Sequence, residues 1–234
     1  MRFSTSSTLF ILVYVDDIIV TGSCKEEIEH VILLLNISFS LKDIGDLNYF
    51  LGIEVKATRE GLHLSQKRYI EDLLRRSKMD NARPLPTPMV SSLKLTFDEG
   101  DPIPNATDYR SIVGGLQYVT ITRPEIAYSV KRILRYLKGT SEEGILLRRS
   151  ETLNLTRFCD ADWGNDLCDR RSTTGYCIFL GRNVVSWSSK KQAVVSRSST
   201  EVEYRSLANA TSELIWLQSL LNELKVEIRN PPVL

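Results

Sequence analysis

Histidine and cysteine are scarce in this sequence of 234 residues. Only His30 and His63 are present, which excludes a histidine-rich metal site and leaves carboxylates as the ligands of any bound metal. The four cysteines form no C-x-x-C pair and are too sparse for a disulfide scaffold. We therefore expect free thiols and a reducing compartment.

Long apolar runs are also missing. The run from Leu9 to Val15 follows Arg2 and is ended by Asp16 and Asp17, without a small-residue cleavage site. It is far shorter than the ~20 apolar residues of a membrane span. We expect a chain that is neither secreted nor inserted into a membrane, with a cytoplasmic or nuclear location.

An excess of charge of either sign is absent as well. Thirty Lys and Arg residues face 29 Asp and Glu residues, which gives a formal net charge of +1. This excludes a globally basic nucleic-acid binder, so any nucleic-acid surface must be local. With 42% hydrophobic and 25% charged residues, the composition is that of a globular protein and not of a disordered one.

Apolar periodicity and turn residues predict a mixed chain of α+β or α/β class. The expected elements, in chain order, are strands at 9–15 and 18–20, a helix at 23–35, strands at 50–55 and 62–64, helices at 65–77, 108–120 and 124–137, strands at 144–148, 154–159, 176–180, 184–187 and 193–195, and a helix at 201–225. Ser23 with Glu26 is a candidate capping box, and Ser65 is a second candidate cap. Five prolines at 84–104 predict a loop, and the change to strands predicts a domain boundary near 140–153.

Asp16 and Asp17 form the most specific motif, because they interrupt two otherwise apolar runs. Adjacent carboxylates in such a frame repel each other and lose hydration unless a cation compensates. Divalent metals at phosphoryl-transfer centres provide that compensation. The alternative is an acidic hairpin tip that simply faces water.

Several motifs together resemble one family. ILVYVDDIIVTG (11–22) is similar to the palm hairpin of a reverse transcriptase from copia-type LTR retrotransposons. LKDIGDLNYFLGIEV, LSQKRYIEDLL, TRPEIAYSV and RILRYLKGT follow in that family's order. FCDADWGN, DRRSTTGYCIFLG, VVSWSSKKQAVVSRSSTEVEYRSLANA and ELIWLQSLLNEL resemble the family's RNase H domain. The resemblance covers nearly the whole chain from about Leu9 onward.

This resemblance implies a fold and a chemistry. The fold would be a partial reverse-transcriptase palm at 1–60, a thumb or connection region at 61–145 with the proline-rich loop 84–104, and the N-terminal part of an RNase H-like domain at 146–234. Asp16 and Asp17 would hold Mg²⁺ or Mn²⁺ for RNA-directed DNA synthesis. The implied partners are an RNA template, a DNA primer or an RNA–DNA hybrid.

The resemblance also implies that Asp160 and Glu203 are metal ligands of an RNase H-type site. The helix pattern gives independent support for Glu203, since it lies four residues before Leu207 on a predicted apolar stripe. The alternative is a capping box in which Thr200 is the N-cap and Glu203 is its partner. Asp162 is expected to have a structural or solvated role.

Local basic clusters are candidate nucleic-acid contacts. Residues 123–149 carry seven basic and three acidic residues, a net charge of +4, and a second cluster lies near Trp187. A solvated charged face is the alternative interpretation. The candidate contacts are Lys131, Arg132, Arg135, Lys138, Lys190, Lys191 and Arg197.

Compared with the family, both sites are expected to be incomplete. Met1 to Thr8 leave no room for the earlier palm aspartate, and the chain stops before the strand of a later RNase H ligand. A helix-length stretch is also missing at Val130 and Lys131. We therefore expect a fragment with exposed apolar edges that is catalytically inactive. The alternatives are a non-catalytic binder of RNA or hybrid, and an RNase H whose missing ligands come from a second chain.

Overall fold

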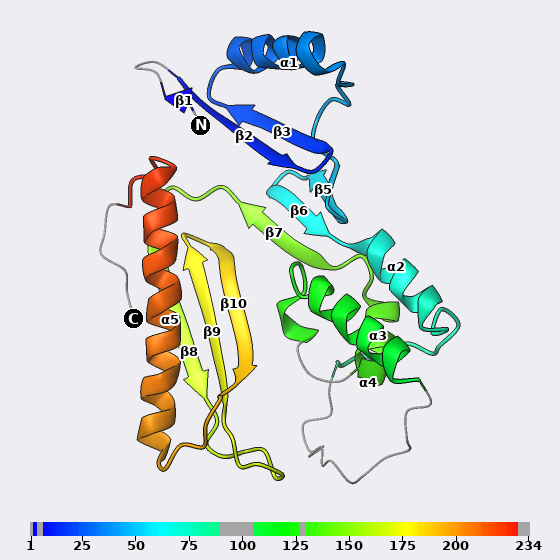
Figure 1. The fold of residues 1–234 in the computed structure, drawn as a ribbon, viewed down its shortest axis with the longest axis vertical. Coiled ribbons are helices and arrows are strands. Elements are labelled where there is room, and N and C mark those ends of the chain that lie inside the picture. The colour runs from blue at the N-terminus through cyan, green and yellow to red at the C-terminus, as the bar shows by residue number, and fades with distance from the viewer. Residues whose placement is uncertain (1, 4–6, 89–104, 127–129, 229–234) are drawn as a thin grey trace. The chain divides into compact units, whose positions relative to one another are not determined.

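The computed structural model describes residues 2–3, 7–88, 105–126 and 130–228. It contains both helices and sheets, which confirms the mixed α+β class (Figure 1). The chain divides into two compact units, Met1–Val55 and Lys56–Leu234. The boundary expected near 140–153 falls inside the second unit, and most of the proline-rich loop lies outside the described residues.

The first unit is built on a β-hairpin. Its elements are β1 (Arg2–Phe3), β2 (Thr8–Tyr14), β3 (Asp17–Gly22), α1 (Lys25–Phe39), β4 (Tyr49–Phe50) and the start of β5 (Ile53–Ala57). β2 and β3 pair antiparallel, and Tyr14 lies opposite Asp17 at the tip. The hairpin expected from the two apolar runs is therefore confirmed.

Helix α1 begins two residues later than expected. Its N-cap is Cys24, which makes no side-chain cap hydrogen bond. Ser23 Oγ accepts a hydrogen bond from the Thr8 backbone N–H at 2.9 Å, and Glu26 accepts one from the Cys24 thiol at 3.0 Å. The predicted Ser23–Glu26 capping box is wrong because the Ser23 hydroxyl instead fastens the end of β3 to β2.

Little of the first unit is buried. Among its described residues, only Ser7 and Leu9 are buried, and α1 has no buried residue. The apolar residues of β2 from Ile11 to Tyr14 are all exposed. A small sheet with one helix and so little buried apolar area has little hydrophobic stabilisation of its own. The expectation of exposed apolar surface at the hairpin is confirmed.

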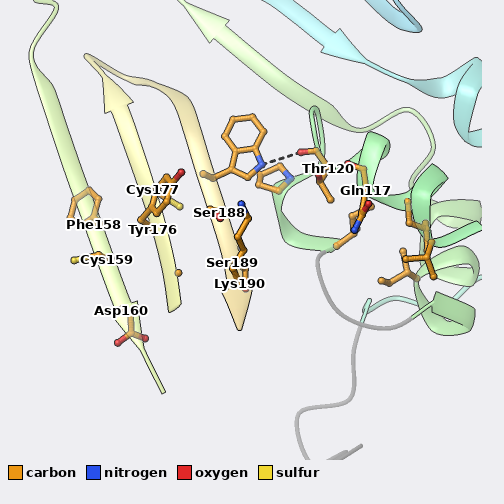
Figure 2. Close-up of a pocket in the computed structure, with 17 residues that line it drawn as sticks. Gln117, Thr120, Phe158, Cys159, Asp160, Tyr176, Cys177, Ser188, Ser189 and Lys190 are labelled. Carbon is orange, nitrogen blue, oxygen red and sulfur yellow. Dashed lines mark hydrogen bonds between the residues drawn. The ribbon is translucent and has the colours of Figure 1, made fainter. Parts of the chain in front are cut away.

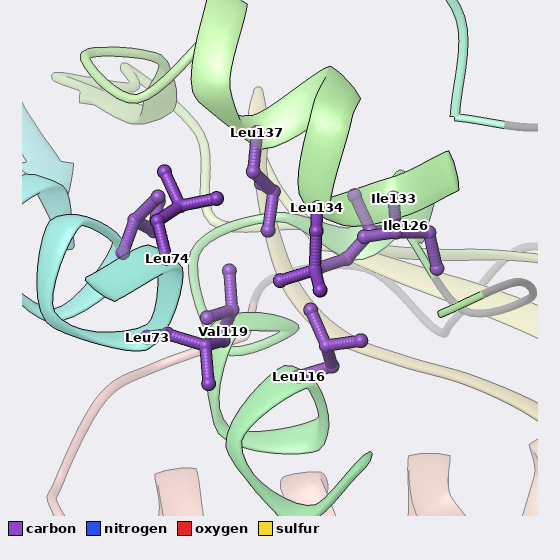
Figure 3. Packing of buried hydrophobic residues seen from close by; sticks show 9 residues of the cluster. Leu73, Leu74, Leu116, Val119, Ile126, Ile133, Leu134 and Leu137 are labelled. Carbon is purple, nitrogen blue, oxygen red and sulfur yellow. The ribbon is translucent and has the colours of Figure 1, made fainter. Parts of the chain in front are cut away.

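The first part of the second unit is a cluster of helices flanked by two paired strands. Its elements are β6 (Gly61–Ser65), α2 (Lys67–Arg76), α3 (Ala106–Val119), a 3₁₀ turn η1 (Pro124–Ile126), α4 (Val130–Gly139) and β7 (Gly144–Arg148), which pairs antiparallel with β6. The apolar faces of α2, α3, η1 and α4 meet in one core (Figure 3). Its buried members are Ile70, Leu73, Leu74, Leu116, Val119, Ile126, Ile133, Leu134 and Leu137. The three- and four-residue spacing of these positions is that of amphipathic helices.

The helix ends here differ from the expectation. Ser65 is buried at the end of β6 opposite Gly144, so it does not cap α2, and the N-cap is Gln66. Asn105 caps α3, because its side-chain oxygen accepts hydrogen bonds from the backbone N–H groups of Thr107 and Asp108. The helix expected at 124–137 is a 3₁₀ turn followed by α4, with 127–129 outside the described residues.

A buried cation connects the elements around this core. Arg123 is 2% exposed, and its guanidinium donates hydrogen bonds to Glu125, Thr140 and Glu143. The same guanidinium lies over the Tyr136 ring, 5.2 Å from its centroid. Two carboxylates and a ring face thus compensate the lost hydration of a charge whose burial would otherwise be costly.

A second core lies between a sheet and the C-terminal helix. Strands β8 (Leu155–Ala161), β9 (Thr173–Leu180) and β10 (Asn183–Lys191) form an antiparallel sheet with β9 in the middle, and α5 (Ser199–Glu223) packs on one of its faces (Figure 1). The buried core residues are Leu155, Ile178, Leu214, Leu217 and Leu221. In the described ranges, no helix has both the length and the apolar character needed to cross a membrane.

The strand predicted at 193–195 is not formed. The buried side chain of Gln192 donates hydrogen bonds to Thr174 Oγ1 and to the Val202 carbonyl, and it accepts one from Ser196 Oγ. These bonds hold the segment as a loop that leads from β10 into α5. The prediction is wrong because a buried amide, which the apolar pattern does not reveal, fixes this loop.

A lysine of β10 forms ion pairs with two aspartates of the connection between β8 and β9, and we call this arrangement the aspartate clamp. Lys191 Nζ lies 2.5 Å from Asp166 Oδ2 and 2.9 Å from Asp169 Oδ2. The other oxygen of Asp166 accepts hydrogen bonds from the backbone N–H groups of Cys168 and Asp169. The Lys191 ammonium, together with these N–H groups, lowers the pKa of Asp166 to about 2.

Two adjacent glycines of α3 provide a test of the helical packing. A Cβ atom on Gly115 would lie 2.7 Å from Cδ1 of the buried Leu73, whereas a Cβ atom on the exposed Gly114 would meet nothing within 4 Å. Gly114→Ala should stabilise the chain by up to about 1 kcal/mol through helix propensity. Gly115→Ala should destabilise it by about 1–3 kcal/mol through overpacking. Urea unfolding measures both, and equal effects would contradict the α2–α3 contact.

The aspartate clamp predicts how the stability of the folded chain depends on pH. Because the pKa of Asp166 is lowered in the folded chain, its contribution to stability is present above pH 3.8 and is lost as the pH falls toward 2. In Lys191→Met the pKa of Asp166 should rise from about 2 toward 3.8, as measured by NMR titration of the carboxyl carbon. The matched variant Lys190→Met should leave it near 2. If the pKa of Asp166 stayed near 2 in Lys191→Met, the role of Lys191 in the aspartate clamp would be refuted.

Candidate functional site

The first candidate site is the tip of the β2–β3 hairpin. Val15 and Asp16 form its two-residue turn, and Asp17 begins β3. Val15 has a φ of 49°, a left-handed conformation that is unfavourable for a β-branched residue by about 1–3 kcal/mol. Both aspartates are exposed. The strained turn thus presents two adjacent carboxylates to the surroundings.

A cavity of about 390 Å³ in the first unit adjoins these carboxylates. It is lined by Asp16 and Asp17, by α1, by the loop at 41–48 and by β4. Asp43 and Asp46 also line it, and Asp43 Oδ1 accepts a hydrogen bond from the Gly45 N–H at 2.9 Å. These two aspartates were not among the residues predicted from the sequence, although their spacing around Gly45 in LKDIGDL was a usable signal.

The second candidate site lies where β8 meets α5. Asp160 is exposed near the end of β8, directly opposite Gly175 of β9. Its backbone carbonyl accepts a hydrogen bond from Ser206 Oγ at 3.0 Å. Glu203 lies one helical turn before Ser206, and residues three apart share a helix face. The turn of α5 that contains Glu203 is therefore brought beside the end of β8.

The N-terminal cap of α5 involves Glu201 but not Glu203. The N-cap is Ser198, whose side chain accepts from the Glu201 N–H, and Glu201 accepts from the Arg197 N–H at 2.8 Å. This bond and the one from Arg205 lower the pKa of Glu201. The alternative in which Thr200 and Glu203 form the capping box is therefore wrong. Glu203 is exposed and makes no hydrogen bond or ion pair with the described residues.

The burial pattern of α5 is shifted from the predicted stripe. Ser206 is fully buried while Leu207 is only partly buried, because the small serine lets the helix approach the strands and bind the Asp160 carbonyl. Glu203 consequently lies beside the buried face and not on it. Asp162 accepts hydrogen bonds from the Thr173 N–H and from Asn165, which agrees with its expected structural role.

The candidate metal ligands are all carboxylates. Among the residues that the structure describes, no three His, Cys, Asp or Glu side chains form a group able to hold a metal ion. Mg²⁺ is commonly held in proteins by one or two carboxylates, with water and substrate phosphates as its other ligands. The adjacent carboxylates of Asp16 and Asp17 fit that chemistry as a partial ligand set, whereas Asp160 faces the side of the sheet that α5 does not cover and Glu203 lies on α5.

The candidate nucleic-acid contacts fall into different environments. Arg132 donates to Thr87 Oγ1, and Arg135 donates to the Arg83 carbonyl, so both fasten the loop before 89–104 to α4. Lys191 is held in the aspartate clamp, whereas Lys138, Lys190 and Arg197 are exposed. The side chain of Lys131 lies outside the described residues.

A larger cavity, of about 720 Å³, lies in the second unit next to Asp160 (Figure 2). One wall is the face of the β8–β10 sheet that α5 does not cover, and the other comes from α3, η1 and α4. Trp187 Nε1 donates a hydrogen bond to the Thr120 carbonyl at 3.0 Å and connects the two walls. The basic cluster near Trp187 was predicted from the sequence, but this cavity was not.

Comparisons with known proteins place these features in context. The family profile described as reverse transcriptase (RNA-dependent DNA polymerase) matches residues 1–91. The retrovirus-related Pol polyprotein from transposon RE2 of Arabidopsis thaliana is 48% identical over 97% of this chain and 17% of its own length. The corresponding polyprotein from transposon TNT 1-94 of Nicotiana tabacum is 36% identical over 95% of this chain and 19% of its own length.

A shorter relative matches almost end to end. An uncharacterized mitochondrial protein of Arabidopsis thaliana is 44% identical over 89% of this chain and 94% of its own length. The chain spans less than a fifth of the Pol polyproteins named above. No solved structure matches it. With the matched reverse transcriptase profile and nearly full coverage by these relatives, the chain belongs to the family of copia-type retrotransposon Pol polyproteins.

Proposed function

We propose that this chain is a nucleic-acid-binding part of a copia-type reverse transcriptase and RNase H. Residues 1–60 would be palm, 61–145 thumb or connection, and 146–234 the N-terminal part of an RNase H-like domain. The observation that carries the RNase H part is the bond from Ser206 to the Asp160 carbonyl, since it brings the turn of Glu203 to the end of β8. The polymerase part is supported by the profile match that includes Asp16 and Asp17.

Mg²⁺ or Mn²⁺ is the cofactor that suits these residues. When bound, such an ion would activate the attacking oxygen and stabilise charge on the phosphoryl group. The part of this chain's residues would be to hold it: Asp16 with Asp17 in the first unit, and Asp160 with Glu203 in the second. Their exposure leaves room for water and for substrate phosphates in the remaining coordination positions.

We further propose that the chain by itself binds nucleic acid without turning it over at a useful rate. Two-metal catalysis requires carboxylates that fix both ions in a defined geometry. Among the described residues, no three His, Cys, Asp or Glu side chains form a group of that kind. An RNase H completed by ligands from a second chain remains the competing proposal.

The proposed partners are an RNA template, a DNA primer or an RNA–DNA hybrid. Residues 123–149 carry a net charge of +4 in a chain whose total is +1, so positive charge is concentrated around α4. Lys138 is exposed in the last turn of α4 and forms no ion pair with the described residues. Such unpaired cations supply the salt-dependent part of nucleic-acid affinity.

The metal proposal is tested by Mn²⁺ titration of the folded chain with calorimetry. Glu203→Gln should weaken Mn²⁺ binding in the second unit roughly tenfold, because a charged ligand is replaced by a neutral one. Glu201→Gln is the matched control on the same turn and should change the affinity less than twofold, since its carboxylate caps the helix. Equal effects of the two variants would refute the role of Glu203.

Hydrolysis of a labelled RNA–DNA hybrid tests the catalytic proposal on the same proteins. We expect no cleavage by the wild-type chain in Mg²⁺ or Mn²⁺, with circular dichroism showing that it is folded. Cleavage that Glu203→Gln abolishes would overturn the proposed inactivity. If that cleavage rose more steeply than linearly with protein concentration, ligands from a second chain would explain it.

Salt dependence tests the nucleic-acid contact. Lys138→Ala should weaken hybrid binding and reduce the slope of log affinity against log salt by about 1, because one phosphate contact is removed. Lys25→Ala removes another exposed charge, from α1, where Glu29 lies 3.6 Å away, and should leave the slope unchanged. An unchanged slope in Lys138→Ala would contradict a contact at α4.

A further inference from the structure

The cavity beside Asp160 is not accounted for by the two carboxylate pairs. Its volume of about 720 Å³ falls within the range of small-molecule sites, which is roughly 300–1,000 Å³. The bond from Trp187 to Thr120 fixes its walls to each other, and a two-way bond between the side chain of Asn183 and the backbone of Arg148 joins β10 to β7. These bonds make it a feature built into the second unit.

Two rows of residues cross the sheet face that lines this cavity. Phe158, Cys177 and Trp187 lie opposite one another on β8, β9 and β10, and in the same way Asp160 and Ser189 flank Gly175. Because side chains alternate along a strand, the two rows share one face. Aromatic rings therefore stand on the outer strands, and small residues form the floor between them.

Phe158 is an unusual wall residue because it is 63% exposed. Its ring is held edge-to-face against Phe179, with the centroids 5.9 Å apart and an interplanar angle of 88°. The indole N–H of Trp187 is already bound to Thr120, which leaves the ring faces as its remaining means of contact. Fixed, accessible ring faces bind planar ligands by stacking.

The floor contains a glycine that the protein's own packing does not require. A Cβ atom on Gly175 would meet only the Ser188 carbonyl, at an ordinary distance of 3.8 Å. The residue is not among those with positive φ, and a glycine inside a strand weakens it. A glycine in this position is typical of a site where a ligand approaches the backbone closely.

The polar groups of the cavity suit a nucleotide. Gln117 lies on the α3 side and offers both a donor and an acceptor, as a base edge requires (Figure 2). Lys190 lines the cavity and forms no ion pair with the described residues, unlike its neighbour Lys191. A long, exposed lysine side chain that borders a cavity and has no ion-pair partner can reach a phosphate at its mouth.

We propose that this cavity binds an unpaired nucleotide of a nucleic-acid strand, with its base over Gly175 against Phe158 and its phosphate at Lys190. The proposal rests on the nucleic-acid binding proposed above and adds a pocket that reads one unstacked base. The bound nucleotide would also lie beside the Asp160 carboxylate, because Asp160 lines the same cavity.

The test is calorimetric titration of the full chain with adenosine 5′-monophosphate (AMP) and with adenosine, in buffer containing EDTA. Phe158→Leu should weaken both ligands about tenfold through lost stacking. Lys190→Met should weaken AMP about tenfold but adenosine less than twofold. Tyr204→Leu is the control, because this ring is equally exposed (68%) but lies on α5, and it should leave both affinities unchanged.

Gly175→Val distinguishes a blocked cavity from a damaged fold. A valine suits a strand and has space at its Cβ position, so the melting temperature should not fall. Its methyl groups would occupy the floor, and AMP binding should be lost. Undiminished AMP binding in Gly175→Val, or no binding by the wild-type chain, would overturn the proposal.

The EDTA buffer separates this proposal from the metal sites. If AMP fails to bind while Glu203→Gln still lowers Mn²⁺ affinity, only the nucleotide cavity is refuted. If AMP binds as expected while Mn²⁺ affinity is the same in Glu203→Gln and Glu201→Gln, the cavity stands and the metal proposal falls.

Discussion

The rotational position of α5 on its sheet is the constraint on which the second unit's chemistry depends. Leu214, Leu217 and Leu221 pack against the strands, and Ser206 comes close enough to bind the Asp160 carbonyl. A helix fixed at both ends in this way cannot turn without uncovering apolar area and losing a hydrogen bond from a buried hydroxyl. The exposed position of Glu203 next to β8 follows from that packing. The same contact leaves the opposite sheet face uncovered by α5, and this face forms one wall of the large cavity.

The two units differ in how far they can stabilise themselves. The second has two apolar cores and a buried Arg123 whose charge is balanced by glutamates. The first has two buried residues in its described part and a hairpin turn that keeps Val15 in an unfavourable conformation. Backbone strain is maintained only where surrounding contacts enforce it. The hairpin aspartates therefore depend on contacts that the hairpin itself does not supply, whereas Asp160 is held by its own sheet and helix.

Residues of the same type that lie next to each other, or two positions apart, have different structural roles in this chain. Lys191 closes the β8–β9 connection while Lys190 lines a cavity, and Glu201 caps α5 while Glu203 is available to a ligand. Sequence patterns identified the helix that carries the two glutamates, because helical periodicity is a local property, but the strand predicted at 184–187 ends before the two lysines. They could not assign the tasks, because the partner of Lys191 comes from a loop 25 residues earlier that folds back onto β10.

The sequence by itself determined the mixed class, the hairpin around Asp16 and Asp17, most of the helices and strands, and the family resemblance, since each depends on residues close in the chain. Tertiary structure decided that Ser23 and Ser65 do not cap helices, that no strand forms at 193–195 and that Ser206 takes the place of Leu207 on the buried face. It also decided the cavity between the sheet and α3. These features arise from hydrogen bonds and packing between distant segments, whose free energies outweigh the small local preferences that a sequence pattern expresses.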